Sequence, residues 1–148
     1  MRKVIVLSGP SGSGKTTWAR KNHPDAVVCS ADHFFIDEDT GEYHFDPSKI
    51  AIAHSECMQA FLMNLQRDDG VIVVDNTNIR HWERQNYITA AKNAGWEVEQ
   101  EFFNVKSVEA IRMCAKRNSH GVPTDVVARM AIEHENTAYG VGTVSYTH

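Results

Sequence analysis

The sequence predicts an α/β fold in which a parallel sheet of about four strands is sandwiched between helices. Short, continuous runs of apolar and β-branched residues, such as Val4–Leu7 and Val71–Val74, are typical of strands buried on both faces of a parallel sheet. Segments with helical spacing separate these runs, and this alternation favours parallel pairing through right-handed crossovers. Polar residues follow the ends of several predicted strands, which is where ligands bind in such sheets.

The first part of the chain begins with the strand Val4–Leu7. A glycine-rich loop follows, and then a helix over Thr16–Asn22, which Pro24 stops. A second short buried strand is predicted over Ala26–Ser30. The polar and aromatic stretch Ala31–Phe45 is predicted to be a loop of functional length.

A longer helix is predicted to begin at Pro47, with Asp46 as its cap. Its apolar residues recur at helical spacing, at Ile50, Ala53, Cys57, Phe61 and Leu65. Asp69–Gly70 then breaks the chain, and the third buried strand, Val71–Val74, ends at Asp75.

The second half of the chain continues the alternation. Helix is predicted from about His81 to Gly95, and Trp96–Phe103 reads as a fourth strand near an edge, because its polarity partly alternates. A further helix is predicted over Val108–Arg117, and a last one over Thr124–Glu135. The remaining residues, about 136–148, are rich in Gly, Ser and Thr and are predicted to form a loosely held tail.

Length and composition bound the possible functions. The 148 residues suit one domain, 1–148, and a hydrophobic fraction of 42% is enough for a buried core. The net charge of −4 argues against a protein that coats long stretches of nucleic acid, but not against one that grips a single end. The only apolar run near the N-terminus is too short for a signal peptide or a membrane span, so we expect a cytoplasmic protein without a membrane partner.

A phosphate-binding loop is predicted by the run Gly9-Pro10-Ser11-Gly12-Ser13-Gly14-Lys15-Thr16, which lies between a predicted strand and a predicted helix. This pattern places the fold among the P-loop NTPases. Lys15 is expected to reach the β- and γ-phosphates and act in catalysis, and the Thr16 hydroxyl is expected to ligate Mg²⁺. The residues expected to bind ATP, or another NTP, are Gly9, Ser11, Gly12, Ser13, Gly14, Lys15, Thr16 and Thr17.

Two aspartates follow strand ends near this loop. Asp32 could take the proton of an attacking hydroxyl, or it could be an ordinary cap or turn residue. Asp75 ends the third strand, where an acid of the magnesium shell would lie. Asn76, Thr77 and Asn78 beside it could hydrogen-bond an acceptor, or this group could form a plain turn at the strand end.

A basic segment follows the helix that ends at Arg117. Lys116 and Arg117 could close over the phosphates as part of a lid, because arginine binds phosphate bidentately, or they could be a solvated helix end. Phe34 and Phe35 could stack on a base or simply pack in the interior.

Taken together, these motifs resemble the 5′-kinase domain of the phage-type polynucleotide kinases and the related kinase-like domains of some larger animal proteins. The resemblance covers Lys3 to about Glu135 and rests on the following segments: Gly14-Lys15-Thr16, Ser30-Ala31-Asp32, Val74-Asp75-Asn76-Thr77-Asn78, Gly95-Trp96-Glu97-Val98-Glu99, Lys116-Arg117-Asn118-Ser119 and Gly121-Val122-Pro123. It implies Asp32 as the general base for a 5′-hydroxyl, Asp75 as an active-site acid and Arg117 as a lid arginine.

Two positions depart from the pattern of that family. Phe35 stands where the phage enzymes carry an arginine that contacts the acceptor's phosphate. The lid turn is shorter, so that only His120 could replace a second lid arginine. Both departures concern the acceptor or the lid, so the expected donor, ATP with Mg²⁺, is unaffected.

Three functions follow as hypotheses. The first is a polynucleotide kinase that transfers the γ-phosphate of ATP to a 5′-hydroxyl end of DNA or RNA, with Asp32, Phe35, Asp75, Thr77 and Asn78 at the acceptor. The second is a kinase for a nucleoside, a hydroxymethylated base or another small hydroxyl compound. The third, of another class, is a sensor or adaptor that binds ATP without transferring phosphate. The sequence does not specify the oligomeric state.

Overall fold

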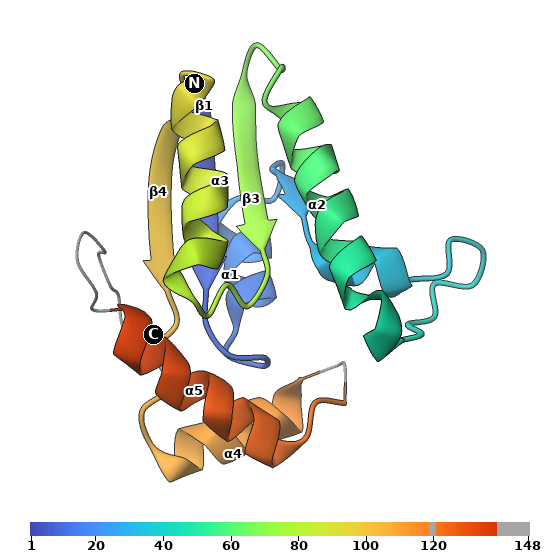
Figure 1. Cartoon of the computed structure of the whole chain (residues 1–148), viewed down its shortest axis with the longest axis vertical. Helices are drawn as coiled ribbons and strands as arrows, with labels where there is room; N and C mark the ends of the chain where they lie inside the picture. Colours follow the sequence, from blue (N-terminus) through green and yellow to red (C-terminus); the bar gives the residue numbers. More distant parts are fainter. Residues whose placement is uncertain (119–120, 139–148) are drawn as a thin grey trace.

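Four parallel strands form the centre of the molecule, in the spatial order β2–β3–β1–β4 (Figure 1). The structure is a computed structural model that describes residues 1–118 and 121–138. The strands are β1 (Arg2–Ser8), β2 (Val27–Cys29), β3 (Gly70–Asp75) and β4 (Glu97–Phe102). The predicted parallel sheet of four strands is confirmed.

The sequence of each strand fits its place in this order. The middle of β1, Val4–Leu7, is completely buried because β3 and β4 flank it and both of its faces are covered. β3 lies between β1 and β2 and is equally apolar. β4 pairs with a strand on one side only, so the predicted edge position of this segment is confirmed. An edge strand tolerates the polar residues that β4 carries.

Helices cover the two faces of the sheet. α2 (Ile50–Asn64) and α3 (His81–Asn93) pack against one face, and α1 (Lys15–Asn22) packs against the other (Figure 1). The first interface buries the side chains of Val4, Val6, Phe61, Ile72, Val74, Tyr87 and Ile88. The second buries those of Ile5, Leu7, Ala19, Val73 and Phe103. Side chains of one strand therefore alternate between the two layers.

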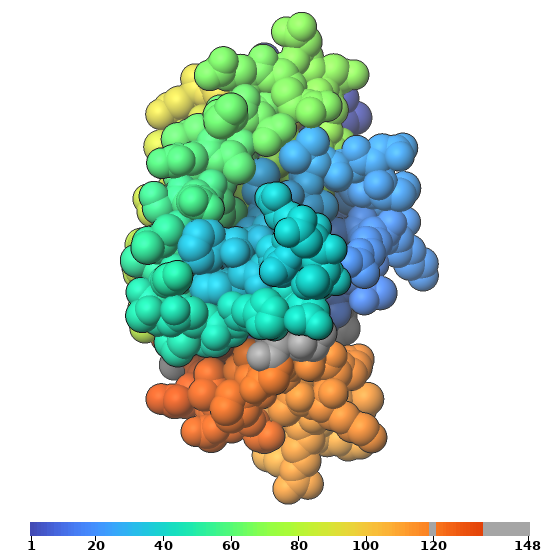
Figure 2. All heavy atoms as spheres, turned by 90° about the vertical axis from the view of Figure 1, so that its right-hand side faces the viewer, coloured from blue at the N-terminus to red at the C-terminus, as the bar shows by residue number. Residues whose placement is uncertain are grey.

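The last two helices form a separate layer at the carboxyl end of the strands. α4 (Val108–Arg117) and α5 (Thr124–Ala138) pack on each other around Val105, Cys114, Val127 and Ala131 (Figure 1). In the space-filling view they form a distinct lobe at one end of the molecule (Figure 2). This placement sets the pair directly against the edge of the sheet where ligands bind in such folds.

The predicted loop over Ala31–Phe45 is partly wrong. Its first residues, Ala31–Phe35, form a 3₁₀ helix, η1, because the Ser30 hydroxyl accepts a hydrogen bond from the Asp32 amide at 3.2 Å and caps it. The predicted cap at Asp46 is confirmed, since its carboxylate accepts a hydrogen bond from the Ser48 amide at 3.0 Å. The chain there begins as a second 3₁₀ helix, η2 (Pro47–Lys49), before α2.

α5 continues to Ala138, beyond the predicted end at Glu135, so residues 136–138 are helical and not part of a tail. The rest of the predicted tail, 139–148, lies outside the described residues. No helix within 1–118 and 121–138 has the length and apolar character needed to cross a membrane.

Candidate active site

The glycine-rich loop joins β1 to α1 at the carboxyl edge of the sheet, as predicted (Figure 1). Its first glycine is tightly enclosed: the Gly9 amide donates to the Thr77 carbonyl at 2.8 Å, and a Cβ on Gly9 would lie 2.7 Å from the Phe103 carbonyl oxygen. Only glycine fits this close approach of backbone. The loop is thereby anchored to the segment that follows β3.

Gly12 meets the lobe formed by α4 and α5. It has a φ of 77°, and a Cβ there would lie 2.0 Å from the carbonyl oxygen of Cys114 in α4. A second contact joins the same partners, because the Ser11 hydroxyl lies 3.9 Å from the Met130 sulfur of α5. The lobe is therefore in direct contact with the phosphate-binding loop.

Two features of the loop suit a phosphate ligand. Gly14, with a φ of 97°, forms the N-cap of α1, so the positive end of that helix opens into the loop. The Ser13 hydroxyl is buried and has no hydrogen-bond partner within the described part of the chain. A buried hydroxyl of this kind is costly unless a ligand completes it.

Lys15 is buried inside the loop, with 8% of its surface exposed. Its ammonium donates to the carbonyls of Gly9 and Pro10, each at 2.9 Å. Burial lowers the pKa of Lys15, while the negative charges of Asp75 and Asp32 oppose this shift. Both predicted carboxylates therefore lie within electrostatic range of the predicted catalytic lysine.

Thr16 and Asp75 come together across the sheet edge. The Thr16 hydroxyl donates to Asp75 Oδ2 at 2.7 Å, which joins the first turn of α1 to the end of β3. Both are oxygen donors of the kind that Mg²⁺ prefers, and this ion commonly takes few protein ligands and keeps several waters. Among the described residues, no group of three or more His, Cys, Asp or Glu side chains is placed to hold a metal. The oxygens that would suit Mg²⁺ at this edge are those of Thr16 and Asp75.

Asp32 lies on η1 and is partly buried. One of its carboxylate oxygens, Oδ1, accepts a hydrogen bond from the Tyr43 hydroxyl at 3.2 Å. The backbone of η1 is held by a second contact, since the buried Asn76 side chain accepts from the Ala31 amide at 2.8 Å. Asn76 follows Asp75 directly, so one turn after β3 connects the predicted metal ligand with the predicted base.

Asn76 makes structural contacts within the protein, and its contact with an acceptor stays a prediction. Its side chain is 7% exposed, and its amide nitrogen lies 3.5 Å from the Cys57 sulfur, which also contacts the Tyr87 hydroxyl at 3.3 Å. The Asn76 side chain therefore holds the backbone of η1 next to the end of β3. No sequence pattern distinguishes this role from that of its neighbours, because it depends on how α2 and η1 lie against β3.

Asn78 and Thr77 both make contacts that hold the phosphate-binding loop, Thr77 through its carbonyl and Asn78 through its side chain. Asn78 adopts a φ of 44°, is 2% exposed, and donates from its side chain to the Leu7 carbonyl at 2.8 Å. Such left-handed geometry is typical of Asn in turns. The turn at the end of β3 therefore explains the position and the contacts of Asn78. Contact of Thr77 or Asn78 with an acceptor stays a prediction.

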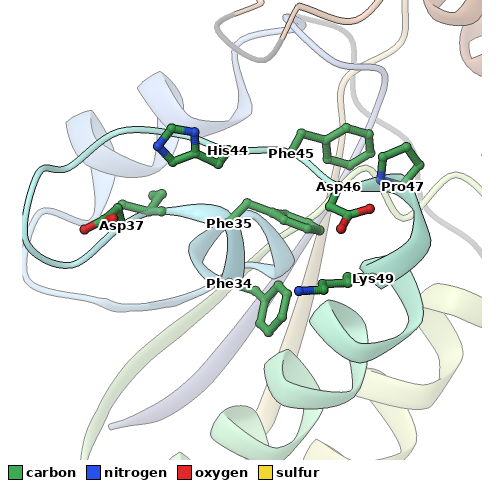
Figure 3. A pocket seen from close by; sticks show the side chains of 9 residues that line it. Phe34, Phe35, Asp37, His44, Phe45, Asp46, Pro47 and Lys49 are labelled. Carbon is green, nitrogen blue, oxygen red and sulfur yellow. The ribbon is translucent and has the colours of Figure 1, made fainter.

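Phe35 is buried, with 6% of its surface exposed. Its ring packs edge-on against those of Phe34, Tyr43 and Phe45, with centroid distances of 5.1, 6.1 and 5.1 Å. Phe45 is 49% exposed and, with Phe35 and Lys49, borders an open hollow of about 590 Å³ (Figure 3). Interior packing accounts for Phe35, and its contact with a substrate stays a prediction.

Arg117 ends α4 and is exposed. It lies one turn beyond Cys114, whose carbonyl faces Gly12, so the predicted lid arginine belongs to the helix that contacts the loop. Asn118 closes this end of the helix, accepting from the Val122 amide at 2.8 Å and donating to the Ala115 carbonyl at 2.8 Å. His120, the predicted substitute for a second lid arginine, lies outside the described residues.

A buried polar cluster lies directly behind the loop and was not predicted. Ser8 Oγ lies 2.9 Å from His134 Nε2 of α5 and donates to the Asn78 carbonyl at 2.7 Å, while Arg84 donates to the same carbonyl at 2.9 Å. The Phe102 ring packs against both Arg84 and His134. Burial, with the charges of Arg84 and Lys15, lowers the pKa of His134 to about 4. A neutral histidine therefore ties the lobe to β1.

The order of the strands, the loop after β1 and the Thr16–Asp75 pair define a P-loop kinase-like fold. The model of the AAA domain family matches residues 4–136, so the chain belongs to this family. It is 29% identical over 138 residues to NEDD4-binding protein 2 of Homo sapiens, a match that covers 88% of this chain and 7% of that protein. The chain thus spans only a small part of this relative.

Solved structures share the fold at low sequence identity. A chain of the Pnkp1/Rnl/Hen1 RNA repair complex is similar with a TM-score of 0.70 and 19% identity, over 92% of this chain and 45% of that one. A gluconokinase from Sinorhizobium meliloti 1021 is similar with a TM-score of 0.60 and 16% identity, over 99% of this chain and 82% of that one. The fold is therefore shared by a chain of an RNA repair complex and by a gluconokinase.

Proposed function

We propose that this protein is an ATP-dependent kinase that transfers the γ-phosphate to the 5′-hydroxyl end of a polynucleotide. The observation that carries the proposal is the convergence of Lys15, the Thr16–Asp75 pair and Asp32 at one edge of the sheet. A module that only binds a nucleotide needs Lys15 and the Thr16–Asp75 pair, but it has no use for a general base such as Asp32. The resemblance of the sequence motifs to polynucleotide 5′-kinases supports the choice of acceptor.

The loop amides, the N-terminus of α1 and Lys15 would hold the phosphates of ATP. Thr16 and Asp75 would hold Mg²⁺, which when bound neutralises charge on the β- and γ-phosphates. Asp32 would accept the proton of the acceptor hydroxyl as that oxygen forms a bond to the γ-phosphorus and the bond to ADP breaks. Arg117 would move toward the γ-phosphate from the end of α4 and stabilise its charge.

The test uses labelled ATP and a 5′-hydroxyl oligonucleotide. Asp32→Asn should reduce transfer by roughly 10²–10⁴-fold, because it removes the base, and should leave ATP affinity unchanged. Asp25→Asn is the matched control, since Asp25 is an exposed carboxylate before the N-terminal end of β2. Full transfer by Asp32→Asn would reject the proposed mechanism.

A kinase of small hydroxyl compounds is the second candidate, and one observation favours it. The exposed side chains that follow η1 are largely acidic: Asp37, Glu38, Asp39 and Glu42. This segment forms part of the surface near the aromatic hollow (Figures 2 and 3). Carboxylates repel the phosphates of a polynucleotide but not an uncharged nucleoside.

A panel of acceptors separates the candidates. Label on oligonucleotides supports the first proposal, and label only on nucleosides, hydroxymethylated bases or small alcohols supports the second. Tight ATP binding with no labelled acceptor would instead indicate a sensor or adaptor module. Replacing the four carboxylates by amides should increase transfer to oligonucleotides under the first proposal, because their repulsion of the acceptor is removed.

A further inference from the structure

The segment after η1 folds back on itself and returns Tyr43 to the predicted base. Ile36 and Tyr43 form an antiparallel bridge, and the Asp37 amide donates to the Glu42 carbonyl at 2.8 Å. The His44 amide donates to the Phe35 carbonyl at 2.8 Å, which fixes the returning strand against η1. These contacts close the turn on both sides of Tyr43.

Aromatic neighbours hold the Tyr43 ring in one orientation. The ring stacks on Phe45 with an angle of 9° between the planes and 6.4 Å between centroids. Phe35 packs against it edge-on at 6.1 Å. A tyrosine held by two rings keeps little freedom, so its hydroxyl has a defined direction. That direction leads to Asp32 Oδ1, at 3.2 Å.

The hydrogen bond between Tyr43 and Asp32 can have only one direction. An ionised carboxylate accepts hydrogen bonds and donates none, so the Tyr43 hydroxyl is the donor. Partial burial and the charge of Asp32 raise the pKa of Tyr43, so the phenol stays protonated over the working pH range. Tyr43 therefore gives up no proton; it holds one carboxylate oxygen in place. Lys15, from the loop, also interacts electrostatically with Asp32.

We infer that Tyr43 is a positioning residue, which orients the Asp32 carboxylate toward the hydroxyl of the acceptor. This inference rests on the proposed role of Asp32 as the base. A base must meet its proton within hydrogen-bond distance and in the right direction, and a small misplacement costs much of the rate. A side chain that fixes the rotation of the carboxylate therefore contributes to transfer without touching the acceptor.

Tyr43→Phe tests this role, because it keeps the ring packing and removes only the donor. We expect the kcat for transfer to fall about ten-fold, with the KM for ATP unchanged. The KM for the acceptor should change far less than kcat, because Tyr43 orients the carboxylate without touching the acceptor. A merely structural role would lower the free energy of unfolding and the affinity for ATP together with kcat.

Two further measurements keep the result decisive. Tyr87→Phe removes a tyrosine hydroxyl that bonds Cys57 in the core, and it should leave kcat unchanged. The ¹³C resonance of the Asp32 carboxyl carbon, assigned by its loss in Asp32→Asn, should shift in Tyr43→Phe even without any acceptor. An unchanged resonance together with an unchanged kcat in Tyr43→Phe would overturn the inference. Full transfer by Asp32→Asn would overturn the proposed function instead, so the two failures are distinguishable.

Discussion

Thr16 and Asp75 are joined by a hydrogen bond of 2.7 Å between the threonine hydroxyl and the carboxylate oxygen Oδ2. The bond connects the helix that follows the phosphate-binding loop with the end of the neighbouring strand. It places two hard oxygen donors side by side where the phosphates of a bound nucleotide would lie. The first prediction follows from this pair.

Asp75→Asn should abolish most of the effect of Mg²⁺ on ATP binding. The amide has a weaker affinity for a hard cation than the carboxylate, so affinity for ATP with Mg²⁺ should fall about 10–100-fold. Affinity for ATP without Mg²⁺ should stay the same or rise, since a negative charge is removed near the phosphates. Titration calorimetry with and without Mg²⁺ measures both. Thr16→Ser, which keeps the hydroxyl, serves as the control, and an undiminished Mg²⁺ effect in Asp75→Asn would contradict the assignment.

Gly12→Ala should uncouple the phosphate-binding loop from α4. The new methyl group would lie 2.0 Å from the Cys114 carbonyl oxygen, so one of the two segments must move. Gly41→Ala is the matched control, because Gly41 has a similar φ of 74° but an added Cβ would meet nothing within 4 Å. The control should lose about 1–2 kcal/mol of unfolding free energy from backbone strain alone.

The Gly12 variant should lose at least about twice as much as the control, together with most of its ATP affinity. Urea denaturation and ATP titration of both variants provide the comparison. Equal losses in the two proteins would mean that the contact with Cys114 has no energetic consequence.

His134 should make the protein less stable as the pH falls. Its pKa is about 4 in the folded state, against 6.5 ordinarily, so between these values the unfolded chain binds a proton that the folded chain does not. The stabilisation is complete above pH 6.5 and is lost as the pH falls toward 4. At pH 5 this loss amounts to about 2 kcal/mol.

The pH effect is measured by urea denaturation at pH 7.5 and pH 5. His134→Gln should lose less stability between these two values than the unmodified protein does. His54→Gln, at an exposed position of α2, should keep the original difference. A His134→Gln protein with the full difference would assign the pH dependence to other groups.

Asn76→Ala should slow transfer without weakening ATP binding. The substitution leaves the Ala31 amide buried without its partner, at a cost of about 1–3 kcal/mol, and it frees η1 to move. Since Asp32 lies on η1, kcat should fall while the KM for ATP is unchanged. Asn64→Ala is the control, because its side chain donates to the Ala60 carbonyl within its own helix. A loss of ATP affinity equal to the loss of kcat would show that Asn76 supports the nucleotide site instead.

Arg117→Ala should reduce kcat with no change in stability, because the side chain is exposed and would act only on the phosphates. Removal of a lid arginine is expected to reduce the rate of transfer by about 10³-fold or more. Arg112→Ala, an exposed arginine on the same helix, provides the comparison for a general loss of positive charge. If both variants lose the same activity, the effect belongs to the charge of α4 and not to Arg117.

Local sequence patterns were enough to predict most of the elements. The predicted helix over Val108–Arg117 has the observed bounds, and the strands over Val4–Leu7 and Val71–Val74 differ from the observed ones by one or two residues at their ends. These segments were predictable because apolar periodicity and strand-like composition are properties of neighbouring residues. The Ala31–Phe45 stretch was not, because a serine cap and a return through Tyr43 give no periodic signal.

The amino-acid sequence by itself determined the parallel sheet, through the alternation of strand-like and helical segments along the chain. It also determined the glycine-rich loop with Lys15 and Thr16, because that motif depends on spacing within a few residues. Only the tertiary structure decided that Phe35 is buried and that Tyr43 bonds Asp32. It also decided that His134 meets Ser8, which is 126 residues away along the chain. The physical reason is that such contacts depend on the order of the strands and on the docking of α5, which no local pattern specifies.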